Sequence, residues 1–142
     1  MSFNPVCKGD IVGGKFQTEN CVAEGKNTII FLARWKETIP AVTLALKFEQ
    51  NIPENIYLKN EIHVMMRLQE SNHFTKTVEF GKHGEFNYLA VELLGPNLRD
   101  LANRCPPYKL SLQTLLQFAY QAFDALQTLH QAGFVHGAIK AV

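Results

Sequence analysis

The chain has 142 residues, with 14 lysines and arginines against 13 aspartates and glutamates, a formal net charge of +1, and 46% hydrophobic residues. A hydrophobic share this high with almost no net charge excludes an intrinsically disordered chain, and the absence of a lysine or arginine cluster argues against nucleic acid as a partner. The length suits one core, divided into two small lobes at most.

Short apolar runs separated by turn residues fill residues 15–49. The runs are KFQTENCVA, TIIFLARW and AVTLALKF, and the turns are EGKN and KETIP. This pattern predicts three strands in a meander. A helix is predicted over residues 54–71, with Pro53 at its start, followed by strands over residues 75–80 and 86–93 on either side of the turn GKHGE.

One long helix is predicted over residues 110–132, with Ser111 as its N-cap and Gly133 just past its end. Its apolar side chains form a wide stripe when projected at about 100° per residue. The stripe consists of Leu112, Leu115, Leu116, Phe118, Ala119, Ala122, Phe123, Leu126 and Leu129. The sequence before this helix offers no obvious packing partner, so we expect the stripe to cause self-association or to bind a protein partner.

The three cysteines, Cys7, Cys21 and Cys105, are an odd number at unrelated spacings, which indicates reduced thiols rather than disulfides. No stretch approaches the ~20 apolar residues of a membrane span, and the N-terminus lacks the basic and apolar regions of a signal peptide. We expect a soluble protein of the cytoplasm or nucleus, with no membrane partner.

Glu61 falls within the apolar stripe of the first predicted helix, between Leu58 and Met65. A carboxylate that points at a core needs a partner, unless it lies at the edge of the stripe and reaches water. Both alternatives are open for Glu61.

Lys47 shares one face of its strand with Ala45 and Glu49, because side chains alternate along a strand. A solvated strand face is one explanation of a lysine at this position. An ion pair with Glu61 is the other, since a carboxylate on the following helix would supply the partner that such a lysine needs.

The turn AEGKNT places Ala23, Gly25, Thr28 and Ile30 on the spacing G-x-G-x-x-G-x-V, in which glycines let backbone N–H groups approach phosphates. Only Gly25 is a glycine. The segment is therefore either a phosphate loop with substitutions or an ordinary hairpin turn.

The order of the elements, with Lys47 in ALALK and Glu61 on the next helix, resembles the small lobe of a eukaryotic protein kinase. Three segments are similar to the casein kinase I family, including its tau-tubulin kinase-like branch: ALKFE at 45–49, VELLGPNLRDL at 91–101 and FVHGAIK at 134–140. The resemblance begins near Val12. It implies an α+β fold: after an N-terminal extension (1–14) come a small lobe of five antiparallel strands and one helix (15–94) and the first helices of an incomplete large lobe (95–142).

The resemblance also implies an ATP site, in which Lys47, held by Glu61, contacts the phosphates. The other implied contacts are Val22 and Ile30 above the adenine, Ala45 beside it, Val91 as gatekeeper, the backbone of Glu92 and Leu94 at the adenine edge, and the turn of Ala23 and Gly25 over the phosphates.

The same resemblance places Ala138 where the family has the aspartate that accepts the substrate proton, and puts the magnesium-binding asparagine one residue beyond Val142. It thus implies a chain truncated inside the catalytic loop, without phosphotransfer, with no residues to hold magnesium and with at most weak ATP binding, serving as a binding or decoy module. Two alternatives stay open. The chain is a fragment or mispredicted product of an active serine/threonine kinase, or a structural domain in which Lys47 and Glu61 form only an ion pair.

Overall fold

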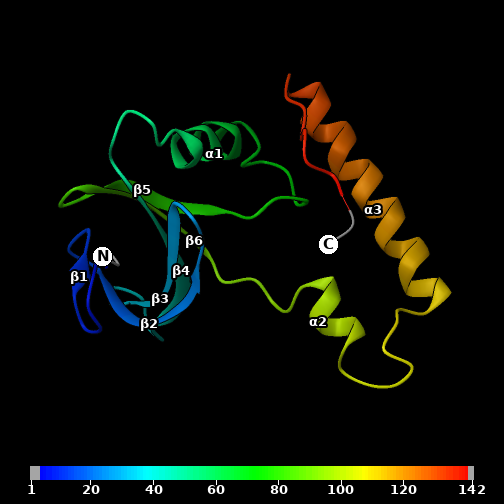
Figure 1. The fold of residues 1–142 in the computed structure, drawn as a ribbon, viewed down its shortest axis with the longest axis horizontal. Coiled ribbons are helices and arrows are strands. Elements are labelled where there is room, and N and C mark those ends of the chain that lie inside the picture. Colours follow the sequence, from blue (N-terminus) through cyan, green and yellow to red (C-terminus); the bar gives the residue numbers. More distant parts are fainter. Residues whose placement is uncertain (1–3, 141–142) are drawn as a thin grey trace. The chain divides into compact units, whose positions relative to one another are not determined.

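The computed structural model describes residues 4–140, which form one antiparallel sheet of six strands and three helices (Figure 1). The chain divides into two compact units. The first contains the residues up to Met66 together with Thr75–Leu93, and the second contains Arg67–Phe74 together with the residues from Leu94 onward. Among the described residues, no helix has both the length and the apolar character that a membrane crossing requires.

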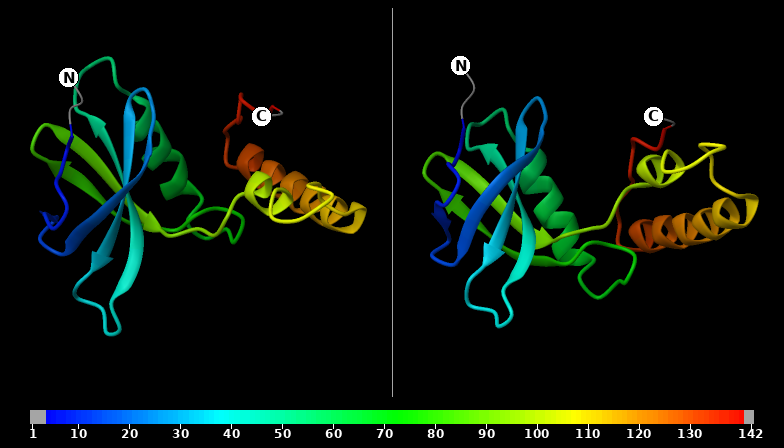
Figure 2. Two further views of the ribbon diagram at one scale, coloured as in Figure 1. Left: turned by 60° about the horizontal axis from the view of Figure 1, so that its bottom comes forward. Right: turned by 90° about the horizontal axis from the view of Figure 1, so that it is seen from below.

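The first unit is built on the sheet, whose strands lie in the order β1-β2-β3-β4-β6-β5. Their bounds are Ile11–Val12 for β1, Phe16–Glu24 for β2, Thr28–Trp35 for β3, Val42–Gln50 for β4, Thr77–His83 for β5 and Phe86–Glu92 for β6. Helix α1 (Tyr57–Arg67) runs beside this curled sheet (Figure 2).

The core of the first unit lies on one face of β4, because Leu44, Leu46 and Phe48 alternate with residues of the opposite face. Phe31 and Phe48 meet edge to face, with ring centroids 6.1 Å apart. Val6 and Val12, which precede the first predicted strand, are also buried in this core.

The sheet has six strands rather than the five that the sequence indicated, because the short β1 pairs with the start of β2. Helix α1 is also shorter than predicted. The predicted range was 54–71, and its residues 54–56 and 68–71 lie outside the helix. Asn55 fixes the approach to the helix by donating from its side-chain nitrogen to the carbonyl of Gln50 at 3.0 Å. The predicted α+β class is confirmed.

The second unit contains α2 (Leu98–Ala102) and α3 (Leu112–Gln131). Ser111 caps α3 as predicted, its hydroxyl accepting from the Thr114 amide at 3.1 Å. Helix α2 is a further helix of the region 95–142, for which the sequence indicated no bounds; Asn97 caps it by accepting from the Asp100 amide at 2.9 Å. His73 Nε2 lies 2.7 Å from Asp124 Oδ2, which ties the segment before β5 to α3 within this unit.

Candidate functional site

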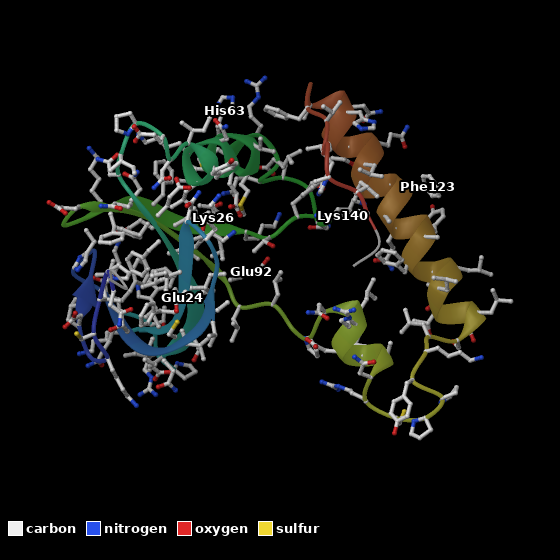
Figure 3. All side chains as sticks on the ribbon, in the orientation of Figure 1. Glu24, Lys26, His63, Glu92, Phe123 and Lys140 are labelled. Atoms are coloured by element: carbon white, nitrogen blue, oxygen red, sulfur yellow. The ribbon has the colours of Figure 1, made fainter. Side chains whose placement is uncertain are left out.

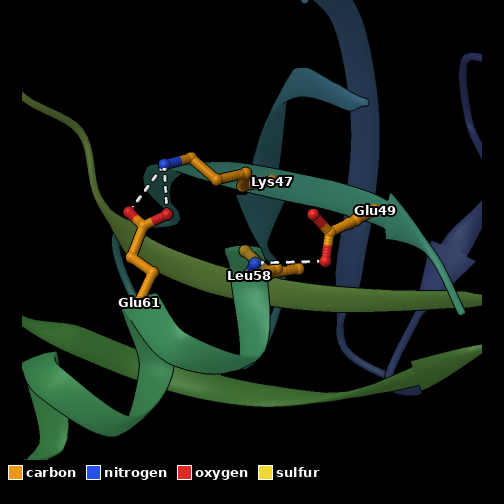
Figure 4. A network of polar contacts seen from close by, with 4 residues as sticks. All are labelled: Lys47, Glu49, Leu58 and Glu61. Atoms are coloured by element: carbon orange, nitrogen blue, oxygen red, sulfur yellow. Dashed lines mark hydrogen bonds and ion pairs between the residues drawn. The ribbon is translucent and has the colours of Figure 1, made fainter. Parts of the chain in front are cut away.

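Lys47 and Glu61 form the central contact of the candidate site. Strand β4 presents Lys47 toward α1, and its Nζ lies 2.6 and 2.9 Å from the two carboxylate oxygens of Glu61 (Figure 4). The lysine side chain is 25% exposed and the glutamate side chain 38%. The pair is thus formed at the edge of the helix, where water also reaches the carboxylate.

The strand register brings four of the implied site residues close to Lys47. Ala23 of β2 pairs with Ile30 of β3, and Ile30 pairs with Lys47 of β4. Ala45, two residues before Lys47 on the same face, pairs with Val91 of β6. Since directly paired residues of neighbouring strands point to the same side, these small and apolar side chains lie on the same face of the sheet as Lys47.

The turn between β2 and β3 is a close hairpin. The Gly25 amide donates to the carbonyl of Thr28 at 2.8 Å, and Val22 just before the turn is 51% exposed. A hollow of about 300 Å³ beside this turn is lined by Phe48 and Gln50, which belong to the face of β4 opposite Lys47. The described hollow at the turn therefore does not open onto the lysine.

Glu92, at the end of β6, already uses its amide. That N–H donates to the carbonyl of Lys76 at 3.2 Å, while the Glu92 carboxylate accepts from the Lys76 amide at 2.8 Å. The amide of Glu92 is thus not open to a ligand. Leu94, the other implied backbone contact, belongs to the second unit and is 63% exposed.

Ala138 lies in the segment 134–140, which has no helix or strand. Its amide donates to His136 Nδ1 at 3.2 Å, and its methyl group is exposed, so this position offers no side-chain proton acceptor. Ala141, Val142 and the expected asparagine position lie outside the described residues. Within residues 4–140, no three His, Cys, Asp or Glu side chains are grouped in a way that could hold a metal ion.

Glu49 is the site residue to which the sequence analysis gave no role. It is fully buried on β4, two residues after Lys47, and one carboxylate oxygen accepts a hydrogen bond from the Leu58 amide at 3.1 Å. The available signal was its spacing from Lys47, which places both side chains on the face toward α1. Spacing alone does not indicate that this carboxylate contacts the helix backbone.

The profile of a family described as protein tyrosine and serine/threonine kinase matches residues 16–142. A Dictyostelium discoideum protein named "Probable serine/threonine-protein kinase" is 28% identical over 132 residues, 93% of this chain and 26% of that protein. A Caenorhabditis elegans protein named "Putative casein kinase I" is 28% identical over 138 residues, 95% of this chain and 40% of that protein. The chain spans between about a quarter and two fifths of the length of these relatives.

Proposed function

Because this chain belongs to the protein tyrosine and serine/threonine kinase family, we propose that it is a casein kinase I-like domain that binds ATP weakly, does not transfer phosphate, and serves as a binding or decoy module. The similarity of residues 45–49, 91–101 and 134–140 to that family and its tau-tubulin kinase-like branch supports the finer assignment. The observation that carries the proposal is the alanine at position 138, in a chain that keeps the pair of Lys47 and Glu61.

Loss of phosphotransfer follows from the chemistry of position 138. In the family, an aspartate there accepts the proton of the attacking hydroxyl group. The methyl group of Ala138 has no lone pair, and loss of such acid–base assistance costs typically 10²- to 10⁴-fold in rate.

Weak nucleotide binding follows from two features near Lys47: the ion pair with Glu61 is kept, and two glycines of the phosphate loop are replaced. The ammonium group is held by Glu61, and the small side chain of Ala45 on the same face of β4 leaves room for a flat base. However, Ala23 and Thr28 stand where the family has glycines, so their side chains occupy space into which a phosphate would move. Lys47 would contact the phosphates of ATP, which would supply the transferable phosphoryl group in an active relative.

The experiment compares the full chain with Lys47→Met. With Mg-ATP and casein, neither protein should incorporate phosphate above background. Millimolar Mg-ATP should raise the melting temperature of the native chain but not of the variant, because a ligand that binds only the folded state stabilises it. Phosphate transfer by the native chain, lost in Lys47→Met, would overturn the inactivity. An equal thermal response in both proteins, or none, would reduce Lys47 and Glu61 to a structural ion pair.

A second candidate function is that of an active serine/threonine kinase of which this chain is a fragment, favoured by the share of each relative that the chain spans. Sequencing the transcript across the codon of Val142, followed by the same assay on the encoded protein, separates the two proposals. A longer product that phosphorylates casein would replace the first proposal.

The binding role would use the apolar surface of α3. A groove of about 510 Å³ lies within the second unit and is lined by Phe74, by α3 from Phe118 to Leu129, and by Ile139. Phe123, on α3, is 73% exposed (Figure 3). Exposed apolar side chains around such a groove favour association with a second copy of the chain.

A further inference from the structure

Helix α1 begins without a cap from its own sequence. Ile56, which precedes its first residue, cannot accept a hydrogen bond through its side chain, and the first turn contains no acidic residue. The first amides of any helix lack an acceptor within the helix, and the positive end of the helix dipole lies there. Acceptors from outside the helix, either other residues or water, must therefore satisfy this end of α1.

Glu49 of β4 supplies that acceptor. Its Oε2 accepts from the Leu58 amide at 3.1 Å, in the first turn of α1. The residue is 0% exposed, and its Oε1 has no hydrogen-bond partner among residues 4–140. Burying a carboxylate this deeply costs free energy that contact with the helix N-terminus offsets.

The two contacts between β4 and α1 lie side by side. Lys47 and Glu49 are two residues apart on the strand and share one face, while Leu58 and Glu61 are three residues apart on the helix, nearly one turn. Figure 4 shows Glu49 at the start of α1 and Lys47 beside Glu61 further along it. The helix is thus held at two points along one strand.

We propose that Glu49 is a positioning residue: by fixing the first turn of α1, its carboxylate keeps Glu61 in contact with Lys47. This role does not depend on nucleotide binding. It concerns only the equilibrium between a paired and an unpaired Lys47.

The test measures how fast each lysine reacts with an amine-acylating reagent, read by mass spectrometry on the full chain without nucleotide. Pairing with Glu61 protects Lys47, so Glu61→Gln sets the rate of the unpaired lysine. Glu49→Ala should raise the Lys47 rate about fivefold, the effect of losing one helix cap. Glu49→Gln keeps an acceptor oxygen and should give an intermediate rate. Glu54→Ala, which removes an exposed carboxylate just before the same helix, should change nothing.

Lys15 is the internal reference, because it pairs with Glu79 elsewhere in the first unit. A rise at Lys47 alone supports the proposal. An unchanged Lys47 rate in Glu49→Ala, or an equal rise at Lys15 and Lys47, overturns it, since the second result would show that Glu49 only contributes to overall stability.

Hydrogen exchange provides a second test, whose main comparison is made within the native chain. The Leu58 amide should exchange far more slowly than the Lys59 amide in the same turn, and Glu49→Gln should narrow the difference. Equal exchange of the two amides in the native chain would contradict the capping contact, even if Glu49→Ala does not fold.

Discussion

The ammonium group of Lys15 pairs with the carboxylate of Glu79, although the two residues come from opposite edges of the sheet. Lys15 follows the edge strand β1, and Glu79 lies on the other edge strand, β5. The Tyr88 hydroxyl donates to the same carboxylate at 2.7 Å. The sheet is therefore curled so far that its two edges are joined by side chains.

Tyr88→Phe should lower the free energy of unfolding by about 1.5–3 kcal/mol, because it removes a hydrogen bond to a charged group. Tyr88 is 3% exposed, and the ring itself is retained, so packing should not change. Urea denaturation measures the effect. Tyr57→Phe, which alters a tyrosine that is 66% exposed, should leave stability unchanged. Equal stability of both variants would mean that the Tyr88 hydroxyl contributes nothing.

Stability should fall in acid because of Glu79. The hydrogen bond from Lys15, assisted by that from Tyr88, holds the pKa of Glu79 below its ordinary value of 4.5. A carboxylate whose pKa is lowered by folding stabilises the protein fully above its ordinary pKa and loses this contribution as the pH falls through the folded value. Unfolding free energies measured from pH 6 downward should decline less in Glu79→Gln than in the native chain. If the unfolding free energies of the two proteins declined in parallel, Glu79 would not be a cause of the loss of stability in acid.

Stability should also fall in alkali, because folding raises the pKa values of Tyr88 and Lys15. Burial, followed by the hydrogen bond to Glu79, raises the pKa of Tyr88, and the hydrogen bond to Glu79 raises the pKa of Lys15. Their stabilisation is present below the ordinary values near 10 and 10.5 and is lost as the pH rises through the folded ones. In Tyr88→Phe, the decline above pH 10 should be shallower than in the native chain, as followed by circular dichroism. An unchanged slope would contradict the assignment.

Gly13→Ala should destabilise the protein more than Gly14→Ala. Both glycines have positive φ angles, +59° and +74°, so alanine meets the same backbone cost of about 1–2 kcal/mol at either position. A Cβ at Gly13 would also lie 2.5 Å from the Tyr88 hydroxyl oxygen and 2.8 Å from a Glu79 carboxylate oxygen, whereas a Cβ at Gly14 meets no atom within 4 Å. The clash should add about 1–3 kcal/mol. Equal melting temperatures of the two variants would contradict this packing around Gly13.

The exposed surface of α3 should make the chain associate with itself. Multi-angle light scattering during sizing chromatography should show a mass that rises with concentration. Leu116→Lys and Phe123→Lys, at positions 60% and 73% exposed, should shift the chain toward monomer. Gln121→Lys adds the same charge at an exposed position of the same helix and should not. A native chain that stays monomeric at all concentrations would contradict the proposed self-association.

Much of the sheet could be predicted because its signals are local. The run TIIFLARW coincides with β3, Thr28–Trp35, and its neighbours shift by one or two residues at their ends. The start of α1 could not be predicted, because its Leu58 amide is capped by Glu49 of β4 and not by a neighbour in sequence. Pro53, which was expected at the helix start, lies in the preceding turn. β1 was missed because two residues are too short to show alternation.

Strand and helix periodicity offered an ion pair of Lys47 and Glu61 as one of two alternatives, the family resemblance implied it, and the structure contains it. Glu49 lies on the same face of β4 as Lys47, yet no rule of spacing distinguishes a solvated glutamate from one that caps a helix. Its burial depends on the distance between strand and helix, which only the folded chain sets. The hydrogen bond from the Glu92 amide to the carbonyl of Lys76 likewise depends on how β5 lies beside β6, which no local sequence signal reports.

The first residues of the chain matter for anyone who shortens it. The family profile begins at Phe16, yet Val6 and Val12 are 3% and 0% exposed in the core, and the Thr18 amide donates to the carbonyl of Asp10 at 2.9 Å. A recombinant protein trimmed to the profile would lose two core side chains, the strand β1 and Lys15. It should express as insoluble material, so the domain boundary for any biochemical work on this protein lies before Val6.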